Sequence, residues 1–574
     1  MPSLSESPMD SPFLEPRIGI VRKVARSRKV VLALAAAITF GIVQVISHLI
    51  ISTNLLDGIR GSSPPPPPPP PPFMDAPLMP GPPPGTKGIW SQFFGQSASR
   101  KCYELPIPED YWLLSGEDTP AFVEIPHLAD ISVGESICVR VIVPPKAANL
   151  TEAFVPLPDM PWDSILLDIV GAATGISVPV KLAYVNDDRV ERHDGVHIYE
   201  ADVELRDADV YRPEGYLEFR DALWNPEGEL LPQEYKPEEL KISGLSQVMV
   251  TDKYRSSEYS LWRYLDLPLC TESDVDGRWV STGMIPFNTS VLPLPDNLGR
   301  VWMPYKCRLQ RISYEDFAKC AIEKYPRMHW YGDSNLRRVM KKISTLGEWC
   351  STEEDQNGNA CRCEDYTVPF ERFSIHARDT FLDLDPVTGG NTLAGETDYA
   401  RVPENKTRFA IFKMEGLTER NMPPWDARFQ NGLVKKFGEP NAAIVSLVNW
   451  DAAFNSYEYF ASQVKLLIGY LEDTYPVTTK LIIRTGQYHC CFSDQTRTAR
   501  KYSQLRNGYF NDMHVGMIKE ALGDRYSVSV WDVASLAQRR PLVGRQESTQ
   551  CYSNHVRSEV VEVENQVLFN ALCN

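Results

Sequence analysis

His329-Trp-Tyr-Gly-Asp-Ser-Asn-Leu-Arg-Arg338 is the stretch that decides the fold of the second half of this chain. Its apolar and aromatic residues end at Gly332-Asp333-Ser334, and a basic, helix-compatible run follows over residues 336–343. This pattern predicts a strand, a tight turn and a helix, which present one serine hydroxyl beside the free N–H groups of a helix start. Acyl transfer needs such an attacking oxygen and such donors for the oxyanion, so Ser334 is a candidate nucleophile. Taken alone, the tripeptide equally fits an ordinary loop.

The chain from about residue 300 onward alternates apolar strands with helical stretches. The strands are 443–448 and 480–484, and the helices are 456–471 and 509–522. Continuous apolar strands between helices predict an α/β fold with a parallel sheet covered by helices on both faces. Reactive groups in such sheets lie beyond the carboxyl ends of the strands, which is where Ser334 and the residues after Val448 fall.

Residues 115–250 have a different pattern, with short β-type segments separated by turn residues. This spacing predicts an antiparallel β-sandwich of immunoglobulin or filamin type, and its aromatic residues are better interpreted as core than as a ligand site. The segments are 121–125, 136–143, 178–184 and 197–203.

A nucleophilic serine needs a base, and His555 is the strongest candidate of nine histidines. It lies just before an apolar helical ladder over 560–572, and Cys551 and Cys573 bracket that helix. A histidine on a loop fixed by a disulfide can be positioned to accept the proton of Ser334. Its local sequence equally fits a surface histidine at a helix start.

Two further polar positions follow predicted strands. Asn449, directly after Val448, can supply a side-chain amide to an oxyanion hole, or it can cap the segment that follows. His489 follows the strand 480–484 and carries less weight.

Residues 30–52 form an apolar run long enough for one membrane span. Basic residues gather before it, so the positive-inside rule predicts a cytoplasmic tail over 1–29 and a lumenal remainder, as in a type II protein of the Golgi or endoplasmic reticulum. A cleaved signal peptide is the alternative, but the run is longer than the usual apolar region and no clear cleavage site follows. The basic residues are Arg17, Arg22, Lys23, Arg26, Arg28 and Lys29.

Residues 53–114 predict a proline-rich stalk after the span. The unbroken run 64–72 holds nine prolines, which span roughly 28 Å in polyproline II at about 3.1 Å per residue. A docking site for a proline-binding module is the alternative interpretation.

All twelve cysteines lie beyond the predicted span, and an even count there predicts disulfides. Zinc is the rival, because Cys361-Arg-Cys363 and His489-Cys490-Cys491 bring ligands close together, but neither has the paired spacing of a structural zinc site. Glycosylation sequons occur at Asn149, Asn288 and Asn405. The net charge of −16 argues against a nucleic-acid partner.

From Cys270 to the C-terminus the chain resembles the GDSL/SGNH superfamily, and more narrowly its PC-esterase group. That group includes the trichome-birefringence-like polysaccharide O-acetyltransferases, the neurexophilin-and-PC-esterase (NXPE) proteins and the lumenal domain of sialic-acid and capsule O-acetyltransferases. A sandwich before this domain is most similar to the NXPE arrangement, in which a filamin-like domain precedes the esterase. The elements that carry the resemblance are Asp276-Gly-Arg-Trp-Val280 after Cys270, Trp302-Met-Pro-Tyr-Lys-Cys307, Trp330 to Arg337, Val448-Asn-Trp-Asp451, Arg484-Thr485 with His489, and His555 with Glu562, Gln566 and Asn570.

The resemblance implies an SGNH/PC-esterase-like domain over 251–574 that moves an acetyl group to or from a sugar hydroxyl. Ser334 then matches the nucleophile and His555 the catalytic histidine, with Gly332, Asp333 and Asn449 at oxyanion or auxiliary positions. It implies a glycan or polysaccharide substrate, no bound cofactor and no metal. The acetyl donor is not identified, and a partner protein is one source for it.

The chain departs from this group at two positions. Tyr552 occupies the place of the aspartate in the group's D-x-x-H pattern, and no glycine lies near Asn449. Loss of the carboxylate that orients the histidine costs about 10⁴ in kcat in serine proteases. Glu547, Asp532 or a backbone carbonyl is a candidate replacement. The alternative is a non-catalytic glycan-binding or adaptor protein with a degenerate esterase fold.

Overall fold

The structure is a computed structural model, and all the residues that it describes fall within Ile89–Asn574, the second of the two units into which the chain divides. The tail 1–29, the apolar run 30–52, most of the stalk, Asn149, His489, Glu547 and Tyr552 lie outside the described residues. Within those residues no helix is long and apolar enough to cross a membrane. The described residues are 101–574 except 115–118, 127–130, 146–159, 186–194, 221–223, 225–236, 245–246, 253–257, 274, 349–378, 394–397, 419–423, 489–502 and 542–554.

The first half of the described chain forms two facing sheets. One has the order β10-β1-β3-β7-β6 and the other β2-β11-β8-β4-β5, with β9 added on β8. Alternate residues of β3 and β4, such as Val139 and Ile169, fill the core between the sheets. The strands are β1 Phe122–Glu124, β2 Ile131–Ser132, β3 Ser136–Val143, β4 Ser164–Gly171, β5 Ser177–Pro179, β6 Ala183–Tyr184, β7 His197–Glu204, β8 Asp209–Phe219, β9 Glu238–Glu239, β10 Lys241–Ile242 and β11 Val248–Thr251.

One predicted strand of this sandwich is wrong in detail. The segment 178–184 was expected to be continuous, but β5 pairs with β4 in one sheet and β6 pairs with β7 in the other. The chain therefore crosses between the sheets at residues 180–182. Pro179 favours this break, because proline cannot donate a ladder hydrogen bond.

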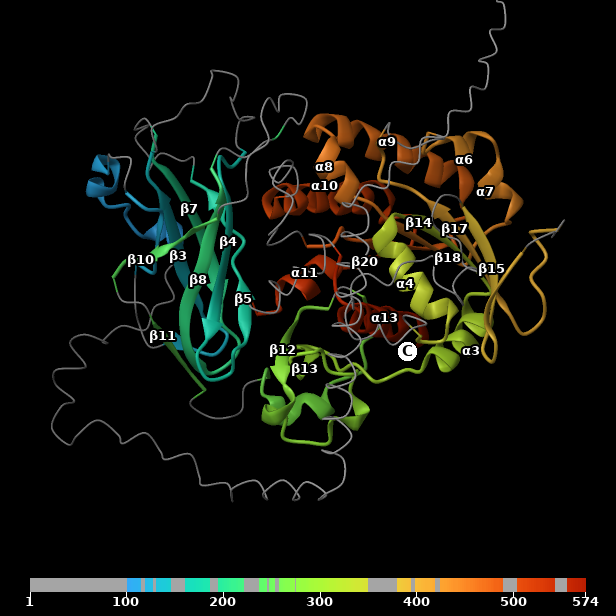
Figure 1. The fold of residues 1–574 in the computed structure, drawn as a ribbon, viewed down its shortest axis with the longest axis horizontal. Helices are drawn as coiled ribbons and strands as arrows, with labels where there is room; N and C mark the ends of the chain where they lie inside the picture. Colours follow the sequence, from blue (N-terminus) through green and yellow to red (C-terminus); the bar gives the residue numbers. More distant parts are fainter. Residues whose placement is uncertain are drawn as a thin grey trace, which may run out of the picture. The chain divides into compact units, whose positions relative to one another are not determined.

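The second half forms a seven-stranded sheet of order β16-β15-β17-β14-β18-β19-β20 (Figure 1). The five strands from β17 to β20 are parallel, as predicted, but β15 and β16 are antiparallel to their neighbours. The short turn after Asp385 explains the pairing of β15 with β16, since a short hairpin can join only antiparallel strands. The strands are β14 Arg327–Gly332, β15 Thr380–Asp385, β16 Gly389–Thr392, β17 Thr407–Lys413, β18 Ala442–Ser446, β19 Lys480–Arg484 and β20 Val528–Trp531, with a separate hairpin of β12 Gly277–Ser281 and β13 Arg300–Pro304.

Helices cover both faces of this sheet. Trp330 of β14 enters the core under α3, α4, α11 and α13, whereas the next residue, Tyr331, enters the opposite core under α6 to α10. The helices are α3 Tyr314–Lys324, α4 Ser334–Ser344, α6 Ala427–Gln430, α7 Leu433–Lys436, α8 Asn449–Phe454, α9 Tyr457–Thr474, α10 Gln504–Leu522, α11 Val533–Gln538 and α13 Ser558–Cys573, and the 3-10 turns are η1 Cys102–Glu104, η2 Glu109–Leu113, η4 Leu261–Asp266, η5 Thr282–Met284 and η6 Thr289–Val291.

The described cysteines confirm the disulfide prediction, because all six are paired. The bonds are Cys102–Cys138, Cys270–Cys307 and Cys320–Cys573. Cys573 therefore ties the end of α13 to α3. Cys551, the other cysteine that brackets this helix, lies outside the described residues.

Three polar residues spaced four apart on α13 bind the chain segment 310–314. Gln566 accepts from the N–H of Ile312 and donates to its carbonyl, at 2.9 and 2.8 Å. Asn570 makes the same pair of bonds with Gln310, and Glu562 accepts from the hydroxyl of Tyr314. Residues four apart share one helix face, so this motif anchors α13.

Candidate active site

The Gly-Asp-Ser turn joins β14 to α4 in the predicted manner. Asp333 is the N-cap residue, and its buried carboxylate accepts the N–H of Asn335 at 2.8 Å. Burial raises the pKa of Asp333, while bonds from the N–H groups of Asn335 and Leu336 oppose that rise. Ser334 is the first residue of the helix, so its hydroxyl and its own N–H lie together at the helix start.

Glycine is needed at position 332 because the surrounding atoms leave no room for a side chain. A Cβ atom there would lie 2.9 Å from the carbonyl oxygen of Ser446 and 2.8 Å from the side chain of Leu336. The glycine therefore lets α4 start close to the end of β18. The contribution of Gly332 to the predicted site is therefore to allow close packing.

Ser334 and His555 lie at hydrogen-bond distance although 221 residues separate them. Ser334 Oγ is 2.8 Å from His555 Nε2, and both residues are half-buried. This is the geometry that a general base needs in order to take a serine proton.

The position of His555 depends on the packing of α13 against α4. Lys342 of α4 forms a buried 2.9 Å ion pair with Glu562 of α13. Val556, the neighbour of His555, packs against an apolar cluster of Leu166, Tyr488 and Ala537. The helix that starts at Ser334 and the helix that follows His555 are thus held together as one unit.

Asn449 lies beside this pair, in a network that joins three strand ends. Its Oδ1 accepts from the side chain of Asn335 at 3.4 Å and from the N–H of Gln487 at 2.8 Å. Its amide nitrogen donates to the carbonyl of Gln487 at 2.9 Å and to Asn507 at 3.3 Å. The amide is therefore engaged in holding the segment after β19, and its role as an oxyanion donor stays a prediction.

The residue before Asn449 has an unusual backbone. Val448 has φ 83° and ψ −54°, and the N–H of Asn449 bonds to the carbonyl of Leu447 at 3.1 Å. These values define a γ-turn of the rare, strained kind, at a β-branched residue that disfavours positive φ. The resemblance leads one to expect a glycine near Asn449. This chain has none there, and Val448 adopts a strained backbone conformation instead.

Asp451 holds this strained turn in place. Its fully buried carboxylate accepts from the N–H groups of Leu417 and Val448, at 2.7 and 3.1 Å, and from the side chain of Asn455. Burial raises the pKa of Asp451 to about 7, against the effect of these bonds. The charge of Asp333 contributes to the rise as well.

Asp532, one of the two candidate partners for His555, caps α11. Its carboxylate accepts from the N–H of Ser535 at 3.1 Å and from Thr485 Oγ1 at 3.2 Å. Its predicted role toward His555 stays untested. The other candidate, Glu547, lies outside the described residues.

Sequence reasoning assigned no structural role to the buried polar residues that support the site. Arg484 donates to Ser446 Oγ and forms a 2.8 Å ion pair with Glu564, both fully buried. Gln487 bonds to the same Glu564. A glutamate and an arginine within apolar runs were the available signal, because such charges are rarely buried without a partner.

One group of described side chains has the composition of a metal site, but its chemistry does not fit. Cys102, Cys138 and Glu200 lie close together, and the two cysteines form a disulfide. Metals bind the thiolate form of cysteine, so this group lacks its sulfur ligands.

Neither a protein-family model nor a curated protein matches the chain. Solved structures similar to it include LAE5, an alpha/beta hydrolase enzyme from the metagenome of Lake Arreo, Spain, with 15% identity over 43% of this chain and 92% of that one, at a TM-score of 0.23. Phospholipase A1 from Streptomyces albidoflavus NA297 has 12% identity over 42% and 97%, at 0.19. The extracellular lipase from Streptomyces rimosus has 11% identity over 40% and 86%, at 0.17. These neighbours are hydrolases by name, and at such TM-scores the function has to be argued from the site.

Proposed function

We propose that this chain is a carbohydrate esterase or glycan O-acetyltransferase that works through an acyl-serine intermediate. The observation that carries the proposal is the 2.8 Å contact between Ser334 Oγ and His555 Nε2 at the carboxyl edge of a parallel sheet. The turn that presents Ser334 also places its backbone N–H at a helix start, where negative charge is stabilised.

The reaction follows from these groups. His555 Nε2 takes the hydroxyl proton while Ser334 Oγ bonds to the acetyl carbonyl carbon, and the N–H of Ser334 donates to the oxyanion. The C–O bond to the leaving alcohol then breaks, and that alcohol takes the proton from His555. Water or a sugar hydroxyl next gives its proton to His555 and bonds to the acyl carbon. The bond from that carbon to Ser334 Oγ then breaks, and Ser334 Oγ takes the proton back from His555, which releases acetate or an acetylated sugar.

The cellular setting of the proposal rests on the sequence. The apolar run 30–52 as a type II anchor, the disulfides and the sequons all suit a lumenal domain. The described sequon residues Asn288 and Asn405 are exposed, as glycan attachment requires. A membrane-bound partner that supplies acetyl groups is part of this proposal for the transferase case.

Turnover of an activated acetyl ester by the full-length protein tests the chemistry. We expect Ser334→Ala and His555→Ala each to lower kcat/KM by at least 10³-fold, since the two residues act as one unit. Ser462→Ala, on the exposed side of α9, is the matched control and should turn over the ester like the wild type. Full activity of either site variant would remove that residue from the mechanism.

A serine-reactive phosphonate separates the enzyme from a non-catalytic glycan-binding protein. We expect a mass shift on the peptide that contains Ser334, and none after Ser334→Ala. Mass spectrometry of cellular glycans with the Ser334→Ala protein then distinguishes the two reactions. Loss of glycan acetylation indicates a transferase, and a gain indicates an esterase.

A further inference from the structure

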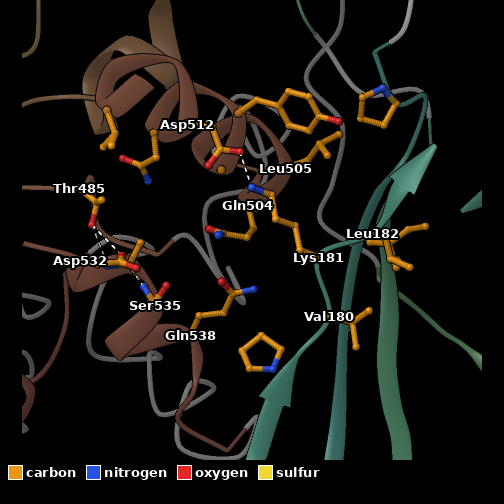
Figure 2. A pocket seen from close by; sticks show the side chains of 18 of the residues that line it. Val180, Lys181, Leu182, Thr485, Gln504, Leu505, Asp512, Asp532, Ser535 and Gln538 are labelled. Atoms are coloured by element: carbon orange, nitrogen blue, oxygen red, sulfur yellow. Dashed lines mark hydrogen bonds and ion pairs between the residues drawn. The ribbon is translucent and has the colours of Figure 1, made fainter. Parts of the chain in front are cut away.

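A cavity of about 570 Å³ lies between the sandwich and the α/β domain. This volume is within the range of small-molecule sites, about 300–1,000 Å³. Figure 2 shows Lys181 of the sandwich reaching toward Asp512 of α10, with Thr485, Asp532 and Ser535 on another side of the cavity. Both domains therefore contribute side chains to one hollow.

The cavity lies on the same edge of the sheet as Ser334. Thr485 directly follows β19 and Asp532 directly follows β20, whereas Ser334 follows β14. The strand order β14-β18-β19-β20 puts two to three strand spacings between them, roughly 10–15 Å at about 4.8 Å each. The cavity and Ser334 therefore lie at the same end of the sheet, a few sugar-residue lengths apart.

One apolar cluster connects the two places. Leu166 and Ala537 pack with Val556, the residue after His555. Their sequence neighbours Ile165 and Gln538 line the cavity. β4 and α11 therefore contribute both to the cavity wall and to the packing of Val556, the neighbour of His555.

The lining combines apolar side chains with polar ones and carries no net charge. Three carboxylates are balanced by three cations, and amide and hydroxyl groups such as those of Gln504 and Tyr509 add donors and acceptors. This balance suits an uncharged ligand with many hydroxyl groups better than a phosphate or an acidic sugar. The ion pair at Lys181 is solvent-exposed, so opening it for a ligand costs little. The charged residues are Asp163, Lys181, Asp512, Lys519, Asp532 and Arg539.

Two glycines of α10 keep the cavity open. Gly508 and Gly516 both line it, and a Cβ atom on either would meet nothing within 4 Å. Glycine inside a helix costs about 1 kcal/mol each relative to alanine. A 19-residue helix thus has two unfavourable residues on the wall where side chains would take up space.

We propose that this cavity binds further sugar residues of an uncharged oligosaccharide whose acyl-bearing or acyl-accepting residue lies at Ser334. The sandwich is then part of the substrate site, with Lys181 contributed to the glycan. This inference rests on the proposed function for its link to Ser334. Binding in the cavity is nevertheless measurable without turnover.

The test is oligosaccharide binding by the full-length Ser334→Ala protein on a printed array of neutral, acidic and sulfated oligosaccharides. We expect binding of neutral chains of at least three residues. In the same background, Gly508→Trp or Gly516→Trp fills the cavity and should weaken that binding at least tenfold. Gly508→Ala, which leaves most of the space, should keep it.

Gly469→Trp in α9 is the matched control, because a Cβ atom there also meets nothing within 4 Å and the residue does not line the cavity. Unchanged binding in both cavity-filling variants, equal loss in Gly469→Trp, or selection of acidic or sulfated glycans would overturn the proposal. Ester turnover by otherwise wild-type protein reports separately on Ser334 and His555. A failure of the chemistry is thereby distinguished from a failure of the cavity.

Discussion

Two strand-to-helix turns at the same edge of the sheet are built in opposite ways. The turn after β14 uses a glycine for close packing and an aspartate N-cap, and its residues are chemically suited to their positions. The turn after β18 places Val448 at φ 83°, and the carboxylate of Asp451 holds it there. The carboxylate of Asp333 accepts an N–H from its own turn, whereas the carboxylate of Asp451 also accepts the N–H of Leu417 from another segment. One site can therefore contain a turn that the sequence predicts and a turn that it does not predict.

Among the substitutions that test this comparison, removal of the Asp451 carboxylate should change the free energy of unfolding most. Asp451→Ala leaves the buried N–H groups of Leu417 and Val448 without an acceptor, and each such group costs about 1–3 kcal/mol. We expect a loss of about 3–5 kcal/mol in the free energy of unfolding, measured by denaturant titration. Ester turnover should fall too, because Asn449 loses its support. A loss below 1 kcal/mol would contradict this account of the turn.

The pH dependence of stability isolates the charge of Asp451. Its folded pKa of about 7 exceeds the ordinary value of 3.8, so its contribution to stability is fully present below about pH 4 and is lost as the pH rises through 7. Asp451→Asn does not titrate. The stability advantage of the wild type over this variant should therefore shrink by roughly 2–4 kcal/mol between pH 4 and pH 8. A constant difference over that range would show that Asp451 titrates normally.

Gly332→Ala tests the turn after β14. The new methyl group meets the backbone carbonyl of Ser446 at 2.9 Å, so β18 or α4 has to move. We expect a loss of about 2–3 kcal/mol in the free energy of unfolding, together with a large loss of ester turnover. Gly283→Ala, whose added Cβ meets only Ser281 Oγ at 4.0 Å, is the control and should leave thermal unfolding unchanged.

The smallest predicted effect reports directly on backbone strain. Val448→Gly and Val448→Ala both remove a buried side chain, but only glycine adopts φ 83° without penalty. The glycine variant should be more stable than the alanine variant by about 1 kcal/mol. Ala452→Gly, in α8, is the control: there the protein with glycine should be less stable than the wild type with alanine. An alanine variant as stable as the glycine variant would mean that Val448 is unstrained.

Much of the scaffold was predictable because its signals are local. The strand 480–484 agrees with β19 residue for residue, and Ser456, the predicted first residue of a helix, is the N-cap of α9. The hairpin of β15 and β16 was not predicted, since the pairing of these short strands depends on the turn after Asp385 and on β17. The split of 178–184 into β5 and β6 also escaped, because the sheet that a strand joins is set by distant partners.

The candidate site divides in the same way. The sequence by itself determined that Ser334 follows a buried strand and starts a helix, because glycine, an N-cap aspartate and apolar periodicity act over a few residues. Only the tertiary structure decided that His555 lies 2.8 Å from that serine, through the packing of α13 on α4. It also decided that Val448 adopts its strained turn and that the sandwich forms one side of a cavity on the same sheet edge. These features depend on contacts between residues far apart in the chain, and burial sets their energies.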